Sequence, residues 1–201
     1  MVDCSRPDPE LRHRILTWLG QHTPPPRIRH ILGVERMAAD LAAHYGWDPQ
    51  RAAWAGLLHD LAKYFPPAEL LRLAQQDPQV TLDPILMGDP QLLHADVSAW
   101  VAEQEFGIRD GEVLQAIRDH TLGRPEMTGI SCVVFVADAL EPNRGDNDTL
   151  NHLRQLVYKD LTLGVAQVCD YGLGWLLGKP KLIHPRTLAV RNAFWQRHLV
   201  G

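Results

Sequence analysis

The sequence has few cysteines, no long apolar run and no basic patch, and each absence excludes a class of protein. Its three cysteines are an odd number and lie far apart, at Cys4, Cys132 and Cys169. Such a set is not a disulfide framework, so we expect a reduced, cytoplasmic protein with Cys132 and Cys169 packed in its core. No apolar run is long enough to cross a membrane, and the N-terminal sequence carries no apolar signal segment, so we expect no membrane partner.

The charges are scattered along the chain rather than concentrated. Lys and Arg total 20 and Asp and Glu total 24, which gives a formal net charge of −4. General nucleic-acid binding needs a basic patch or stripe, so we predict no nucleic-acid partner. An acidic protein that handles phosphates concentrates its positive charge in the site instead, through metal ions and a few Arg or Lys side chains.

Nearly the whole chain shows helical spacing of apolar residues, and its length suits one hydrophobic core, so we predict a single all-α domain. Prolines at 24–26 separate an N-terminal helix and proline-rich lead-in, residues 1–26, from the main body with its C-terminal helices, residues 27–197. In residues 130–140, β-branched valines make a strand the alternative, but we predict a helix because the neighbouring segments are helical. We predict a first helix that begins at Pro9 and further helices over residues 27–45, 49–63, 68–76, 91–106, 111–120 and 130–140. A long helix to about residue 171 and a last helix from 185 to about 197 follow.

Histidine and aspartate side chains interrupt apolar stretches of several predicted helices. The adjacent His59-Asp60 pair is the clearest case, because it lies between Leu58 and Leu61 in an alanine-rich predicted helix. A buried carboxylate must be neutralised, hydrogen-bonded or bound to a metal. A lone polar residue of this kind is usually hydrogen-bonded to the backbone, but six together favour a metal centre. The six candidate ligands are His30, His59, Asp60, His94, His120 and Asp138.

The donor atoms predict metals that take nitrogen and oxygen ligands. Four of the residues suffice for one ion, namely His30, His59, Asp60 and Asp138, and all six suffice for two ions bridged by the Asp60 carboxylate. The absence of thiolate argues against a closed structural zinc site. Imidazole and carboxylate with open positions suit iron, manganese or another hydrolytic transition metal.

Four further polar side chains follow the candidate ligands closely. Lys63 could pair with the bridging carboxylate or stabilise a phosphate oxygen, and the alternative is a cap of its helix end. Thr121 could donate its hydroxyl to a phosphate or cap a turn. Arg144, and more weakly Arg124, have the planar guanidinium that suits a phosphate chain. An ion pair with Glu141 is the alternative for Arg144.

The pattern His … His-Asp … Asp on helices resembles the HD-domain phosphohydrolase superfamily and, within it, the bacterial YqeK family. The similarity covers roughly residues 27–197 and departs after His94, where Ala95-Asp96-Val97-Ser98 replaces a smaller, glycine-containing segment, so that Asp96 adds a charge near the site. His184, at the start of a predicted helix, is interpreted as a cap. The similar segments are 29–34, 55–63, 92–94, 116–123, 137–144 and 184–187.

The resemblance implies an HD-domain helical bundle in which the six candidate ligands hold two metal ions, with iron as the first choice. It implies an enzyme that cleaves diadenosine tetraphosphate symmetrically to two ADP, a nucleotide as partner, and a homodimer as one oligomeric state. We predict attack by metal-bound hydroxide, with Asp60 and Lys63 as catalytic residues. Another HD phosphohydrolase, acting on dNTPs, nucleoside monophosphates, cyclic nucleotides or guanosine tetraphosphate, is the first alternative. A non-catalytic nucleotide-binding module is the second. One of the six tryptophans could stack on an adenine, but the sequence does not single it out.

Overall fold

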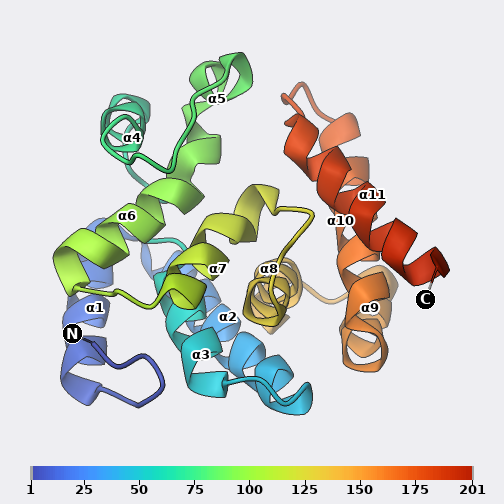
Figure 1. Cartoon of the computed structure of the whole chain (residues 1–201), viewed down its shortest axis with the longest axis horizontal. Coiled ribbons are helices and arrows are strands. Elements are labelled where there is room, and N and C mark those ends of the chain that lie inside the picture. Colours follow the sequence, from blue (N-terminus) through green and yellow to red (C-terminus); the bar gives the residue numbers. More distant parts are fainter. Residues whose placement is uncertain (1, 201) are drawn as a thin grey trace.

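The computed structural model describes residues 2–200, and within that range every regular element is helical (Figure 1). The predicted all-α class is therefore confirmed. The elements are α1 (Pro9–His22), α2 (Pro25–His44), α3 (Pro49–Leu58), α4 (Pro67–Ala74), α5 (Pro84–Gly88), the 3-10 helix η1 (Pro90–Leu93), α6 (His94–Phe106), α7 (Gly111–Leu122), α8 (Gly129–Leu140), the 3-10 helix η2 (Pro142–Arg144), α9 (Asp148–Lys159), α10 (Leu161–Leu177) and α11 (Pro185–Val200).

Local sequence explains where most of these helices begin and end. Asp8, Asp48 and Asp83 each accept a backbone hydrogen bond from the first turn of the helix that follows, and in each case proline occupies the first helical position. Gly107 ends α6 with a φ of 70°, a conformation that costs a glycine little. Residues 129–140 form α8, so the strand alternative for this segment is wrong.

The helix predicted over 49–63 is shorter in the structure, because α3 ends at Leu58 and the chain continues as a turn. The backbone N–H of Ala62 donates to Ser98 Oγ at 3.0 Å instead of to a carbonyl of its own turn. His59-Asp60 therefore lie at the end of a helix, not inside one. Two other predicted helices also divide: 91–106 into η1 and α6, and the long one into α9 and α10, because Asp160 is extended and caps the start of α10.

The helices α2, α3, α7 and α8 form the centre of the molecule, between α4–α6 on one side and α9–α11 on the other (Figure 1). Gly56 allows α3 to pack closely on α2, since a Cβ at this position would lie 2.8 Å from the Cα of Glu35. From α1, Leu11, Ile15 and Leu19 are buried in the same core. The proposed boundary at residue 26 falls in the first turn of α2, which begins at Pro25, and stays a prediction. None of the described helices is long and apolar enough to span a membrane.

Candidate metal centre

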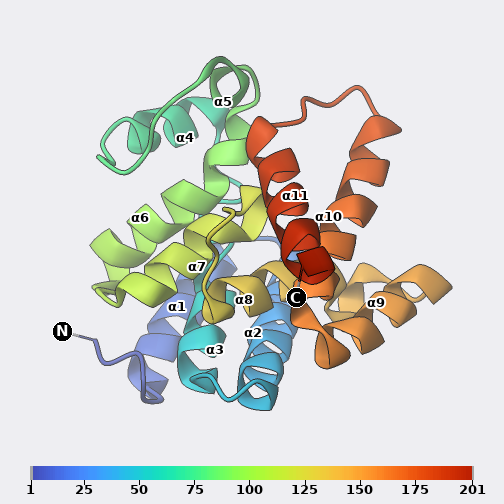
Figure 2. The same cartoon turned by 45° about the vertical axis from the view of Figure 1, so that its right-hand side comes forward.

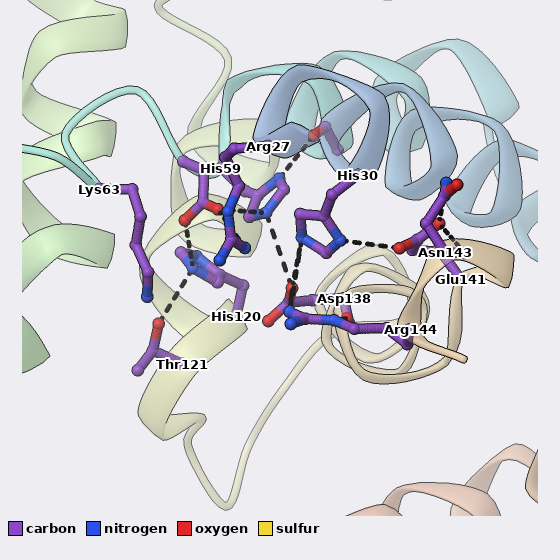
Figure 3. A network of polar contacts seen from close by, with 12 residues as sticks. Arg27, His30, His59, Lys63, His120, Thr121, Asp138, Glu141, Asn143 and Arg144 are labelled. Atoms are coloured by element: carbon purple, nitrogen blue, oxygen red, sulfur yellow. Dashed lines mark hydrogen bonds and ion pairs between the residues drawn. The ribbon is translucent and has the colours of Figure 1, made fainter. Parts of the chain in front are cut away.

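The six predicted ligands converge in the centre of the helical bundle, and Figure 3 labels His30, His59, His120 and Asp138 among them. All are buried except Asp138, whose side chain keeps 22% of its surface exposed. They come from different elements, so the tertiary packing and not a local motif assembles the site. His30 is on α2, His59 and Asp60 follow α3, His94 begins α6, His120 is on α7 and Asp138 is on α8.

The two carboxylate oxygens of Asp60 face different histidines. Its Oδ2 lies 3.3 Å from Nε2 of His59, whereas its Oδ1 lies 3.4 Å from Nε2 of His94 and 3.7 Å from Nε2 of His120. A carboxylate placed in this way can offer one oxygen to each of two ions. This is the arrangement expected of a bridging ligand.

Asp138 completes a second cluster of donors. Its Oδ1 lies 3.0 Å from Nε2 of His30 and 3.7 Å from Nε2 of His59. The donor atoms of His30, His59 and Asp138 all lie within 4.8 Å of one another, and the same is true of those of His59, Asp60 and His120. The structure thus provides two adjacent groups of atoms, each of which could hold an ion.

Hydrogen bonds at Nδ1 orient the histidine rings. In three of them Nδ1 donates to the backbone carbonyl three residues earlier, and because a carbonyl only accepts, the proton is on Nδ1. Nε2 is then left as a lone-pair donor that faces the centre, which is the tautomer that a metal requires. The pairs are His59 with Gly56 at 2.7 Å, His94 with Gln91 at 2.6 Å and His120 with Ile117 at 2.7 Å.

His30 is oriented by a carboxylate instead. Its Nδ1 lies 2.9 Å from Oε1 of Glu141, whose side chain is fully buried. The other oxygen, Oε2, accepts from the backbone N–H and the side-chain amide of Asn143, at 2.8 and 2.7 Å. Sequence reasoning considered Glu141 only as a partner of Arg144 and missed this role. The available signal was an acidic residue directly after the least polar helix of the chain.

The electrostatics of the site favour a cation. Burial alone would raise the pKa of Asp60 and of Asp138, but neighbouring histidines, and for Asp138 also Arg144, hold both values well below the ordinary one. Burial would likewise lower the pKa of His59, yet Asp60 and Asp138 outweigh burial and raise it. Among the described residues, His59 Nε2 makes no well-aligned hydrogen bond. Buried anionic oxygens around an unpaired imidazole nitrogen fit a bound metal ion.

Lys63 and Thr121 border the His94 side of the centre. The Nζ of Lys63 lies 3.1 Å from Nε2 of His94, and burial lowers the pKa of this ammonium group. The Thr121 hydroxyl lies 3.1 Å from the same nitrogen and 3.0 Å from Nε2 of His120 (Figure 3). Both side chains are therefore within reach of a substrate bound at the centre.

The two arginines predicted to bind substrate have different surroundings. Arg144 donates to the backbone carbonyl of Asp138 at 2.6 Å and to its Oδ1, so it is paired with a candidate ligand and not with Glu141 (Figure 3). Arg124 instead donates twice to Asp119, at 2.9 and 3.3 Å. Asp119 is fully buried and also accepts from the Ser131 hydroxyl at 2.7 Å. The position of Arg124 therefore suggests a structural contact.

Other charges near the centre also have defined partners. Arg27, which sequence reasoning passed over, places Nη1 3.1 Å from Oδ2 of Asp60. Asp96 faces Arg118 at 3.6 Å, and burial raises its pKa. The predicted cap at His184 is confirmed, because its Nδ1 accepts from the backbone N–H of Arg186 at 3.1 Å.

A cavity of about 530 Å³ opens directly beside the candidate ligands. Asp138, His120, Thr121 and Arg144 are among the residues that line it. Much of the remaining wall comes from α10, and single residues of η1, α7, α9 and α11, together with α8 and the segment that leads into α11, complete it. A small molecule in this cavity would therefore contact the centre and the C-terminal helices at once.

This fold and this site define an all-α protein with a His-Asp centre under a ligand-sized cavity. The chain belongs to the HD-domain family, which matches residues 27–143. It is 36% identical over 181 residues to the symmetrical bis(5'-nucleosyl)-tetraphosphatase of Halalkalibacterium halodurans, covering 90% of this chain and 95% of that one. It is 33% identical over 183 residues to the enzyme of the same name from Bacillus subtilis, covering 90% and 96%.

A solved structure confirms the fold. The crystal structure of a predicted HD superfamily hydrolase involved in NAD metabolism from Clostridium acetobutylicum superposes with a TM-score of 0.86 at 29% identity, over 92% of this chain and 97% of that one. The expected membership in the HD-domain hydrolases is thus confirmed, and the chain is a hydrolase.

Proposed function

We propose that the protein is a metal-dependent phosphoanhydride hydrolase that cleaves diadenosine tetraphosphate symmetrically to two ADP. The observation that carries the proposal is Asp60, whose two oxygens lie between His59 on one side and His94 and His120 on the other. The names of the two tetraphosphatase relatives, aligned over 90% of this chain, support this substrate.

The six candidate ligands would hold two transition-metal ions, for which we propose iron first and manganese or another metal as alternatives. When bound, such ions neutralise charge on phosphate oxygens and lower the pKa of water. The chain's own residues position the substrate. Thr121 can donate its hydroxyl to a phosphate oxygen, while the cations of Lys63 and Arg144 compensate the charge of the phosphate chain. The cytoplasmic location, the possibility of a homodimer and the lack of nucleic-acid or membrane partners stay predictions.

Product analysis tests this proposal. Protein loaded with iron(II), or in parallel with manganese(II), is incubated with diadenosine tetraphosphate and a panel of dNTPs, nucleoside monophosphates, cyclic nucleotides and guanosine tetraphosphate. We expect ADP as the sole product of the first substrate and slower turnover of the others. Equal amounts of AMP and ATP would contradict symmetrical cleavage, and faster turnover of a panel member would identify a different substrate. Nucleotide binding without turnover would indicate a binding module.

A pair of variants ties the turnover to the proposed site. Asp138→Asn removes a charge that lies 3.0 Å from His30, so ADP production should fall strongly. Asp40→Asn is the matched control, since Asp40 is an exposed carboxylate on α2. Equal activity of the two variants would contradict the assignment of the site.

A further inference from the structure

One face of α10 lines the same cavity as the candidate ligands His120 and Asp138. Val168, Tyr171, Gly172 and Trp175 all line the cavity, and their spacing of three, four and seven residues places them on a single helix face. Figure 2 shows α10 paired with α11 along the side of the bundle that holds α7 and α8. The cavity is therefore lined both by polar side chains of the candidate centre and by a mainly apolar face of α10.

The two aromatic side chains on this face are unusually exposed. Trp175 keeps 54% of its surface accessible and Tyr171 keeps 39%. Gly172, between them on the same face, adds no side chain, and a Cβ there would meet nothing within 4 Å. Large exposed aromatics at the wall of a cavity are typical of a ligand site, because a flat apolar ligand can cover them.

We propose that Trp175, with Tyr171 one turn earlier, is the stacking platform for the base of the nucleotide whose phosphates lie at the metal centre. This inference rests on the proposed function. The shared cavity supports it, because the side chains of Thr121 and Arg144, which suit phosphates, and the indole of Trp175, which suits a purine ring, line the same space. A cavity of about 530 Å³ also lies within the roughly 300–1,000 Å³ of small-molecule sites.

The ammonium group of Lys179 offers a second explanation for Trp175, because it lies 4.1 Å from the centroid of the indole ring. If Trp175 only held this lysine, Lys179→Ala and Trp175→Ala would have the same effect on ligand binding. If Trp175 is the platform, Lys179→Ala leaves binding of the base intact. The two variants therefore distinguish a stacking site from a local contact.

The test measures binding by calorimetry of metal-loaded protein with two probes, ADP and inorganic pyrophosphate, which share phosphates but differ in the base. Trp175→Ala should weaken ADP binding by at least about fivefold, the equivalent of about 1 kcal/mol for one stacked base, and leave pyrophosphate binding within about twofold. Trp175→Phe should restore most of the affinity for ADP, whereas Trp175→Leu should not, because leucine is apolar but not planar.

Leu177→Ala is the matched control, since Leu177 is a 77% exposed apolar residue of α10 outside the cavity wall. Thermal unfolding verifies that each variant is folded. An unchanged ADP affinity in Trp175→Ala, or an equal loss for both probes, would overturn the stacking site alone. If the native protein bound neither probe, the proposed function would be overturned with it.

Discussion

Glu141 Oε1 accepts a hydrogen bond from His30 Nδ1 at 2.9 Å, and this carboxylate has no exposed surface. Among the described histidines of the centre, His30 is the one held by a carboxylate, while the others are held by backbone carbonyls. A carboxylate partner makes the imidazole a stronger donor and fixes the ring toward the metal. The His30 position is therefore the most strongly polarised of the four.

The first prediction concerns this pair. Glu141→Gln keeps the shape of the side chain but removes its charge, so the polarisation of His30 is lost. We expect metal affinity to fall by about 10- to 100-fold, the usual effect of changing such a partner. Competition with a chelator measures the affinity, and Glu126→Gln, at an exposed position, is the control. Native affinity in Glu141→Gln would mean that the hydrogen bond only packs the site.

Gly33, which lies on α2, provides a second test of the contact between His30 and Glu141. A Cβ at Gly33 would lie 2.1 Å from Oε2 of Glu141, so Gly33→Ala must displace the carboxylate. We expect a loss of metal affinity similar to that of Glu141→Gln and a lower melting temperature. Gly20→Ala is the control, because a Cβ there meets nothing within 4 Å and alanine favours the helix by up to about 1 kcal/mol. A fully native Gly33→Ala protein would contradict the geometry around Glu141.

The proposed bridging role of Asp60 predicts a large effect of a small change. Asp60→Asn removes the anion between the two donor groups and leaves Arg27, 3.1 Å away, without its partner. We expect bound metal to fall from about two ions per chain to one or fewer and turnover to fall by at least about 100-fold, since metal ions supply several kcal/mol of transition-state stabilisation. Elemental analysis beside steady-state kinetics measures both. Normal turnover with two ions bound would exclude the bridge.

Asp96 predicts a pH dependence of stability. Burial raises its pKa above the ordinary 3.8, so the folded protein binds this proton more tightly than the unfolded chain. The contribution is fully present below about pH 3.8 and is lost as the pH rises through the folded value. Asp96→Asn should therefore lose less stability than the native protein between about pH 4 and 7. Urea unfolding across this range measures the difference, and parallel pH profiles would contradict it.

The composition of the centre could be predicted from sequence because each ligand interrupts an apolar segment, which is a local signal. The turn at His59-Asp60 could not, because it depends on a hydrogen bond from Ala62 to Ser98, 36 residues away. Alanine and leucine propensity alone continues that helix to Lys63. The partners Glu141 and Arg27 were missed for a related reason. Their roles depend on which helices meet in space, and an acidic residue after an apolar helix, the one local signal at Glu141, does not name His30 as its partner.

Substitutions of the two arginines predicted to bind phosphate should have different effects, one on KM and the other on stability. Arg144→Ala removes a cation at the wall of the cavity, so the KM for diadenosine tetraphosphate should rise by about 10-fold, or about 1.4 kcal/mol, with little change in stability.

Arg124→Ala instead removes the partner of Asp119, whose side chain is completely buried. Leaving that carboxylate with fewer donors should cost about 1–3 kcal/mol of folding free energy while KM stays near native. Chemical denaturation and steady-state kinetics on both variants test the contrast. If Arg124→Ala raises KM without loss of stability, Arg124 exchanges Asp119 for substrate phosphate during turnover. Its contact with Asp119 would then describe only the protein without substrate.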